Sequence, residues 1–458
     1  MFKSLSLDGW RQFRRIDIKL HPRLTVLTGA NGAGKTTILS IISRHLGWGN
    51  QYVATPSRRG TESNALNYSP DLWEVEKLFE NNFSSESLLF ERDEFLGLTE
   101  TEKFEFLNRR NLDRLTLMGE LQAKRRPSGQ STTIGRIEYS SGNSSNIEIY
   151  PNGSNVYDLQ IPHQQPVEGV HIPSHRAASA YQQVQNIPTI PRRRADVFNS
   201  YVSLVRSRFL GGHTQWSPQY YMKETLIALA TFGYGNAAVD ADSESAKLFE
   251  DFQEVLVRML PPTLGFRRLI VRVPEVVLET DTGDFSIDAL SGGVSAVIDL
   301  AWQIFMFQPS TANFVVTLDE PENHLHPALQ RTVLSNLLSA FPQVQFIVAT
   351  HSPFIVGSVP DSAVYALAYD NTNSVVSHLL DMPNKAGSAN DILREVLGVD
   401  ITIPIWAEDR LRQLVSEYSA RAFSREVIAE LRAELVELGL DAHATRAIAS
   451  LAAAKDAQ

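Results

Sequence analysis

The feature that most constrains the fold of this chain is the glycine-rich octet GANGAGKT at residues 29–36, which fits the pattern GxxxxGK[ST]. An apolar run at 24–27 precedes the octet and predicts a buried strand, and helical spacing of apolar residues begins at Thr36. Glycines let successive backbone N–H groups turn inward around a phosphate, and a helix N-terminus adds a favourable dipole. In this pattern Lys35 reaches the β- and γ-phosphates of a nucleotide, and the Thr36 hydroxyl binds Mg²⁺. The octet therefore predicts an α/β fold with a phosphate-binding loop between a strand and a helix.

A second apolar run, FVVTLDE at 314–320, ends in the adjacent acids Asp319 and Glu320. The spacing predicts a buried strand whose carboxyl end carries both acids. At a nucleotide site, Asp319 would hold Mg²⁺ through a water and Glu320 would polarise the attacking water as a general base. Strands often end in acids, so the presence of the glycine loop at 29–36 is what gives this pair weight.

Two further segments follow the same chain order. Ser291, Gly292 and Gly293, here called the SGG segment, open a long apolar helix that lies shortly before Asp319. Ser291 is expected to cap this helix, and the glycines let the backbone approach a phosphate. His351 follows a further apolar strand and could donate a hydrogen bond to a γ-phosphate.

Hydrophobic periodicity predicts the other elements. Strands are expected at 2–27 (an antiparallel pair that breaks at His21-Pro22), 131–161, 170–173 and 268–287. Helices are expected at 195–260, at 327–341 and in the tail from about residue 387, whereas 48–67 is expected to be loop. These boundaries predict a head built from 1–50 and 266–386, an insertion at 51–265 with a helical lobe and a small β subdomain, and a helical tail at 387–458.

Composition narrows the classes of protein. The 458 residues carry a formal net charge of −10, which gives no whole-protein attraction to nucleic acid. The chain has no cysteine, which excludes disulfides, thiol catalysis and Cys-based metal sites. There is no apolar stretch of about 18 residues and no apolar core of a signal peptide near Met1, so we expect a cytoplasmic protein without membrane contact.

The order of these segments resembles the ABC ATPases. The string DEPENHLHP at 319–327 looks like the soluble SMC/RecF/OLD branch, which occurs in DNA repair and in bacterial anti-phage systems. Residues 171–189 also look like stretches of bacterial "AAA family ATPase" proteins of that branch. The resemblance is tight over about 1–50 and 265–360. It implies a P-loop NTPase with an ABC-type head, in which a mixed central sheet and an antiparallel β subdomain are interrupted by a mainly helical insertion.

The resemblance also implies a head-to-tail homodimer that sandwiches two ATP molecules. Thr36 and Asp319 would bind Mg²⁺, Glu320 would activate water and His351 would sense the γ-phosphate. The SGG segment, Ser291, Gly292 and Gly293, would act on the ATP held by the other subunit. The residues that would cradle the phosphates are Gly29, Ala30, Asn31, Gly32, Ala33, Gly34, Lys35, Thr36 and Thr37. Arg11 or Arg14 would lie near the nucleotide.

Some positions depart from the family pattern. Val294 stands where many members have Gln, and the segment after 170–173 has no clear glutamine for the metal, although Gln182 and Gln183 follow. His324 and His326 have no evident third ligand for a metal and are expected to shape the loop beside the nucleotide.

The use of the ATP stays open at this stage. The hypothesis we favour is a conformational switch that regulates a partner effector, as in ATPase subunits of defence systems such as Septu or PARIS. The alternatives are a DNA-repair-type ATPase that clamps DNA directly, for which Arg192–Arg194 and Lys124–Arg126 are candidate phosphate contacts, and an ATP-gated scaffold with little turnover. The amphipathic tail segment 424–440 would pack on its own domain or dock a partner. Oligomers larger than the dimer also stay open.

Overall fold

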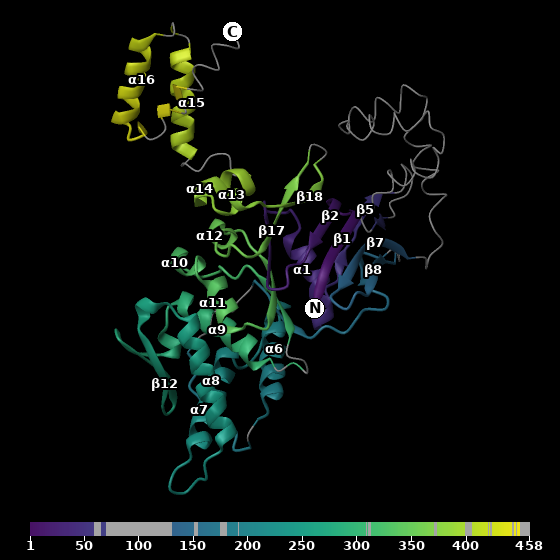
Figure 1. Cartoon of the computed structure of the whole chain (residues 1–458), viewed down its shortest axis with the longest axis vertical. Coiled ribbons are helices and arrows are strands. Elements are labelled where there is room, and N and C mark those ends of the chain that lie inside the picture. The colour runs from purple at the N-terminus through teal and green to yellow at the C-terminus, as the bar shows by residue number, and fades with distance from the viewer. Residues whose placement is uncertain are drawn as a thin grey trace. The chain divides into compact units, whose positions relative to one another are not determined.

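The computed structural model describes residues 1–58, 66–69, 131–150, 154–174, 181–190, 192–307, 309, 313–370, 373–398, 405–419, 421, 424–441, 444–445 and 447–448. The basic turn Lys124–Arg126 and most of the first half of the expected insertion lie outside these residues. The chain divides into two compact units, Met1–Ile392 and Leu393–Gln458 (Figure 1).

The larger unit is built on one mixed sheet, to which eleven of the described strands belong. These strands are β1 (Phe2–Trp10), β2 (Phe13–Lys19), β3 (Leu24–Gly29), β7 (Thr132–Tyr139), β8 (Ser144–Ile149), β10 (Leu159–Gln160), β11 (Gly169–Ile172), β15 (Phe314–Asp319), β16 (Val344–Ala349), β17 (Ala363–Tyr369) and β18 (Val375–Leu379). Their order across the sheet is β10-β8-β7-β1-β2-β18-β17-β3-β16-β15-β11. The expected mixed α/β architecture is confirmed.

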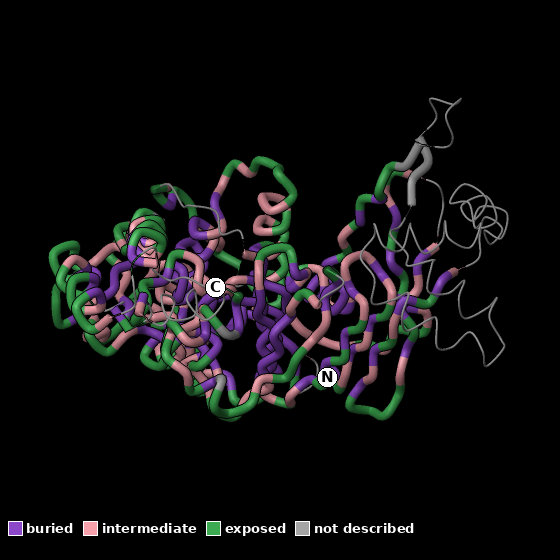
Figure 2. The backbone as a smooth tube through the Cα atoms, turned by 90° about the horizontal axis from the view of Figure 1, so that it is seen from above, coloured by how far each residue is buried: buried purple, intermediate pink, exposed green. Residues whose placement is uncertain are grey.

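One side of the sheet is antiparallel. β1 pairs with β2 and with β7, and β7 pairs with β8, so the hairpin expected at 131–161 extends the sheet that the N-terminal strands begin. Along β1 and β2, buried and more exposed positions alternate, as half-buried strands require (Figure 2).

The other side is parallel and buried. β17, β3, β16, β15 and β11 run side by side in the same direction, and every residue of β3, β15 and β16 is buried. Strands covered on both faces read as continuous apolar runs, which explains the patterns at 24–27 and 314–318. Because parallel strands end at the same edge of the sheet, the segments that follow β3, β15 and β16 meet there.

Helices surround this parallel half. α1 (Lys35–Ser43) packs on β3, β15 and β16, and its apolar residues enter the same core as Leu27, Val315 and Ile347. The other α-helices in this unit are α6 (Arg194–Phe209), α7 (Pro218–Tyr234), α8 (Ser243–Met259), α9 (Gly292–Met306), α10 (Pro327–Gln330), α11 (Val333–Ala340), α12 (Pro353–Val356), α13 (Met382–Lys385) and α14 (Ala389–Asp391). Its short 3-10 helices are η1 (Arg44–Leu46), η3 (Pro262–Leu264) and η4 (Ile287–Ala289), and the π-helix η5 (Ile392–Val396) begins at the last residue of the unit. α8 packs against α7, α9 and α11. A three-stranded antiparallel sheet precedes α9: β12 (Phe266–Arg272), β13 (Glu275–Thr280) and β14 (Gly283–Ser286).

Two predictions from the sequence were wrong in detail. Residues 48–67, expected to be loop, include short strands: β4 (Tyr52–Val53) pairs with β9 (Val156–Tyr157), and β5 (Thr55–Arg58) pairs with β6 (Leu66–Ser69). Tyr52 and Tyr157 stack at a centroid distance of 5.8 Å, a long-range contact that local sequence does not reveal. The helix expected at 327–341 is broken into α10 and α11 at Thr332, whose hydroxyl donates to the Leu329 carbonyl.

The smaller unit is helical. α15 (Ile405–Ser419) and α16 (Arg425–Glu437) share a core to which α16 contributes Val427, Leu431 and Leu435. The apolar face of the 424–440 segment therefore packs on its own unit. Across the part of the chain that the structure describes, helices fall short of the length and apolar character needed to cross a membrane.

Candidate functional site

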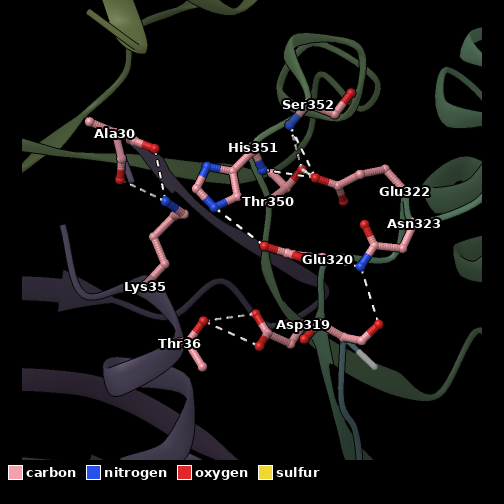
Figure 3. Close-up of polar contacts among 12 residues, drawn as sticks. Ala30, Lys35, Thr36, Asp319, Glu320, Glu322, Asn323, Thr350, His351 and Ser352 are labelled. Carbon is pink, nitrogen blue, oxygen red and sulfur yellow. Dashed lines mark hydrogen bonds and ion pairs between the residues drawn. The ribbon is translucent and has the colours of Figure 1, made fainter. Parts of the chain in front are cut away.

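The segments that follow β3, β15 and β16 converge at one edge of the sheet (Figure 3). The first is the glycine loop 29–36, which leads into α1. The second begins at Asp319 and the third at Thr350. The five side chains expected at the nucleotide end, Lys35, Thr36, Asp319, Glu320 and His351, lie in this cluster.

The glycine loop needs glycine at its ends for steric reasons. Gly29, Gly32 and Gly34 all have positive φ, at 136°, 80° and 88°. A Cβ on Gly29 would lie 2.2 Å from the backbone oxygen of Leu367, and one on Gly34 would lie 2.4 Å from the Phe13 ring. The loop is therefore held between β17 and the β1–β2 hairpin in a conformation that other residues resist.

Lys35 is buried, with 5% of its surface exposed, and its amine turns back onto the loop. Nζ donates to the carbonyls of Gly29 (2.8 Å) and Ala30 (3.0 Å). Burial lowers the pKa of Lys35 to about 8, against the opposing effect of three nearby carboxylates. A phosphate bound in the loop would place a negative charge beside the Lys35 amine and stabilise its protonated form, which burial disfavours.

Thr36 and Asp319 form the candidate metal position. The Thr36 hydroxyl lies 3.3 and 3.2 Å from the two carboxylate oxygens of Asp319, so oxygen donors from α1 and β15 meet. Burial, reinforced by the charge of Glu320, raises the pKa of Asp319 to about 6. Hard oxygen donors of this kind suit Mg²⁺, and a buried carboxylate would be stabilised by a cation, so these residues fit the ion.

Glu320 and His351 face each other beside this pair. The Glu320 Oε1–His351 Nε2 distance is 3.4 Å, and about a third of each side chain is exposed. Glu320 has a positive φ of 48°, a strained conformation for a residue other than glycine. Burial and the charge of Lys35 lower the pKa of His351, which favours a neutral ring. A carboxylate that reaches solvent beside buried charges is suited to polarise a water.

Two residues of the site were missed from the sequence. The Glu322 carboxylate accepts hydrogen bonds from Thr350, His351 and Ser352, and Asn323 Nδ2 donates to Glu320 Oε2 at 3.0 Å and to the Ser174 carbonyl at 3.1 Å. Both residues lie in the string DEPENHLHP, directly after Asp319 and Glu320. In the sequence analysis this string indicated a family resemblance, but no role was predicted for Glu322 or Asn323.

The SGG segment lies at the start of α9. Among the described residues, no hydrogen bond joins it to the cluster around Lys35 and Asp319. Ser291 and Gly292 are exposed, and Gly293 lies against the backbone of His324. Ser291 occupies the N-cap position, but the expectation that its side chain caps the helix was wrong, because the hydroxyl makes no capping hydrogen bond. Gly292 lines a cavity of about 260 Å³, which His324 and Ser295 also line.

Other candidates are engaged elsewhere. Arg11 lies over the rings of Trp10 and Tyr52, and Arg14 pairs with Asp370 at 3.3 Å. Their neighbour Gln12 contacts the glycine loop instead, with Nε2 3.3 Å from the Gly32 carbonyl. The Gln182 side chain bonds to Gln215 and Ser217 before α7, and Gln183 is exposed.

The remaining charged candidates also have structural contacts. His326 Nδ1 accepts from the Ala328 amide at the start of α10. Within the run 192–194, Arg192 pairs with Glu224 at 2.7 Å and the guanidinium of Arg194 lies 4.3 Å from the Phe305 ring centroid. Two of these three arginines therefore serve packing within the larger unit.

The glycine loop, the acid-tipped β15 and the parallel strands around them define a P-loop nucleotide-binding fold. Residues 4–87 match the family described as "AAA domain", and residues 240–357 match the family described as "AAA domain, putative AbiEii toxin, Type IV TA system". Two parts of the chain thus match models of AAA-family ATPase domains, and the chain is similar to retron and Septu ATPases. The sequence had suggested the likeness to Septu but not the one to retron ATPases.

Particular relatives are distant. The chain is 24% identical to the Retron Ec83 probable ATPase of Escherichia coli over 199 residues, which are 41% of this chain and 35% of that protein. It is 29% identical to the Septu protein PtuA of Bacillus mycoides (strain KBAB4) over 158 residues, 32% of this chain and 22% of that one. The chain spans 18 to 36% of the length of the curated relatives it matches. A crystal structure of an Smc head bound to the C-winged helix domain of ScpA matches with a TM-score of 0.39 and 16% identity, covering 83% of this chain and 98% of that chain.

Proposed function

We propose that this protein binds and hydrolyses ATP at composite sites in a head-to-tail homodimer. The observation that carries the proposal is the convergence of Lys35, Thr36, Asp319, Glu320 and His351 at the carboxyl ends of three adjacent parallel strands. Phosphoryl transfer to water requires groups of these kinds: a cation, oxygen ligands for a metal, a carboxylate near solvent and a polar group for the γ-phosphate.

Each residue has a defined task in this proposal. Lys35 leaves the loop carbonyls of Gly29 and Ala30 and pairs with the β- and γ-phosphates, while the backbone N–H groups of residues 29–37 hold them. Thr36 and Asp319 would hold Mg²⁺, an ion that would supply electrophilic polarisation of the terminal phosphate. Glu320 orients and polarises the attacking water, and His351 donates to the γ-phosphate.

The homodimer part of the proposal is supported by the exposed start of α9. Ser291 and Gly292 present a helix N-terminus to solvent, and such a terminus favours an anion. A second subunit would bring this terminus to the phosphates held by the first subunit.

The use of hydrolysis is proposed from the relatives. They are named as retron ATPases and Septu proteins, and we infer that this chain also serves as an ATP-driven switch on a partner effector, with a role in anti-phage defence. Direct clamping of DNA is the alternative, and the internal partners of Arg192 and Arg194 weaken it.

The test is ATP hydrolysis by the purified protein over a series of protein concentrations, with Glu254→Gln, an exposed position on α8, as a control variant. Specific activity that rises with concentration supports a shared site. Specific activity that is independent of concentration in a protein that stays monomeric rejects the dimer. ATP binding without turnover at any concentration favours the scaffold alternative, and salt-sensitive stimulation by duplex DNA favours the DNA clamp.

A further inference from the structure

The short segment that carries His351, residues 350–352, is held by a single carboxylate oxygen. Glu322 Oε1 accepts from Thr350 Oγ1 at 2.6 Å, from the His351 amide at 2.8 Å and from the Ser352 amide at 3.1 Å (Figure 3). Two consecutive backbone amides and one hydroxyl thus point at the same atom. This convergence fixes the direction in which the chain leaves β16.

Both ends of this segment are also attached to the fold. Thr350 is fully buried, and its amide donates to the Leu27 carbonyl of β3, the strand that leads into the glycine loop. The Ser352 hydroxyl donates to Gln330 Oε1 at 2.7 Å and caps α12 by accepting from the Phe354 amide. Glu322 adds its own bonds to all three residues, including the amide of His351, the residue whose side chain enters the site.

The two glutamates on either side of Pro321 contact the same histidine from different directions. Glu320 faces the His351 ring, at 3.4 Å from Nε2, and Glu322 holds its backbone amide. Because only Pro321 separates them and it is buried, a shift of this segment moves both contacts together. The distance between the water-polarising carboxylate and the histidine ring is therefore set by one short stretch of chain.

Stability by itself does not explain the presence of a glutamate at position 322. Its other oxygen, Oε2, is buried and has no hydrogen-bond partner among the described residues. A carboxylate buried with one oxygen unsatisfied costs free energy that neutral side chains would avoid. Such a group is better explained by the geometry that it imposes than by the energy that it contributes.

We propose that Glu322 is a positioning residue that fixes the segment 350–352, and hence the His351 ring, relative to Glu320. The proposal extends the ATPase function, because the geometry matters for turnover only if His351 acts on the γ-phosphate. The arrangement of residues 350–352 is nevertheless a property of the protein without nucleotide.

Two conservative variants separate position from charge. Glu322→Gln keeps an acceptor oxygen at the same reach and removes the charge, whereas Glu322→Asp keeps the charge and withdraws the oxygen by one methylene. Glu254→Gln and Glu254→Asp on exposed α8 are the matched controls. All of these changes remove little volume, so folding should be retained, and thermal unfolding checks it.

The first measurement is amide hydrogen exchange over a peptide that contains residues 350–352, without nucleotide. We expect Glu322→Asp to exchange about tenfold faster than wild type, because bonds to a charged acceptor are lost, and Glu322→Gln to stay within about threefold. Wild-type protection in Glu322→Asp would overturn the proposal, whether or not the protein hydrolyses ATP. Failure of the ATPase proposal therefore shows as absent wild-type turnover, and failure of this one shows in the exchange.

The second measurement is steady-state hydrolysis. We expect Glu322→Asp to lower kcat by roughly 100-fold, through misplacement of the ring, with KM for ATP changed by less than about threefold. Glu322→Gln should retain most of kcat. The reverse order, a severe loss in Glu322→Gln and little loss in Glu322→Asp, would show that the charge of Glu322 matters and its position does not, and would overturn the inference.

Discussion

The starts of α1 and α9 are similar in sequence and different in surroundings. Each follows small residues that leave the helix N-terminus accessible to an anion. At α1, Gly34 is the N-cap, Lys35 is buried and Thr36 bonds to Asp319 of a neighbouring strand. At α9, Ser291 and Gly292 are exposed, and the Ser291 hydroxyl makes no capping bond.

The difference shows which terminus the chain completes by itself. The residues around α1 come from β3, β15 and β16, which bring a cation, metal donors and acids together within one subunit. At the start of α9, Gly293 lies against His324, Leu325 and Leu329 of the same subunit, whereas Ser291 and Gly292 are exposed. Changes on the α1 side should therefore alter binding or chemistry within a subunit, and changes at α9 should act only when subunits meet.

The largest effect is expected from Glu320→Gln. Loss of the general base should lower kcat by roughly 1,000-fold while the affinity for ATP stays within a few-fold, since Glu320 is not needed to hold phosphate. Hydrolysis and equilibrium binding of ATP measured on the same preparation check this, with Glu254→Gln as the control. A variant that retains more than a tenth of the activity would remove Glu320 from the proposed mechanism.

The comparison itself is tested by Ser291→Arg. A bulky cation at the start of α9 should lower hydrolysis by roughly 100-fold or more without changing ATP binding by the monomer. Lys35→Met should instead abolish binding. If the two variants are mixed in equal amounts, about a quarter of the wild-type activity should return, because half of the dimers then have one intact site out of two. No recovery on mixing, with exchange of subunits demonstrated, would contradict a site shared between subunits.

The sequence predicted the α1 side more completely than the rest of the site. The glycine loop, Asp319, Glu320 and His351 each follow a strongly apolar strand, and local order along the chain was enough to predict that they meet. Glu322 and Asn323 were not predicted as site residues, because their roles depend on backbone amides and carbonyls 29 to 149 residues away. The side-chain cap of Ser291 was predicted from residue type, which does not reveal the rotamer or its surroundings.

A third prediction concerns how much the buried carboxylate of Asp319 lowers the stability of the protein when no Mg²⁺ or nucleotide is bound. Because burial raises the pKa of Asp319 from 3.8 to about 6, the folded state binds the proton more tightly than the unfolded state, and stability is lost as pH rises from about 4 through 6. Asp319→Asn should therefore be more stable than wild type at pH 7 by about 3 kcal/mol, a gain that disappears below pH 4.

Urea unfolding at pH 7 and pH 4, without Mg²⁺ or nucleotide, measures this difference. Asp240→Asn, an exposed position, is the control and should show little change at either pH. A less stable Asp319→Asn at pH 7 would mean that the Thr36–Asp319 contact contributes more than the buried charge costs. The Asp319 carboxylate would then be stabilised sufficiently by Thr36, without a cation.

The smallest effect is expected where the two regions adjoin. Asn323 donates to Glu320 and to the Ser174 carbonyl, and the next residue, His324, has its backbone oxygen against Gly293 of α9. Asn323→Ala should lower kcat by about tenfold by freeing the Glu320 carboxylate, with ATP affinity unchanged. Asn323→Asp, which repels Glu320, should be lower still. Loss of activity in Asn323→Ala only at low protein concentration would mean that Asn323 supports the α9 surface and dimer formation. The starts of α1 and α9 would then be coupled through residues 321–326 and would not act independently.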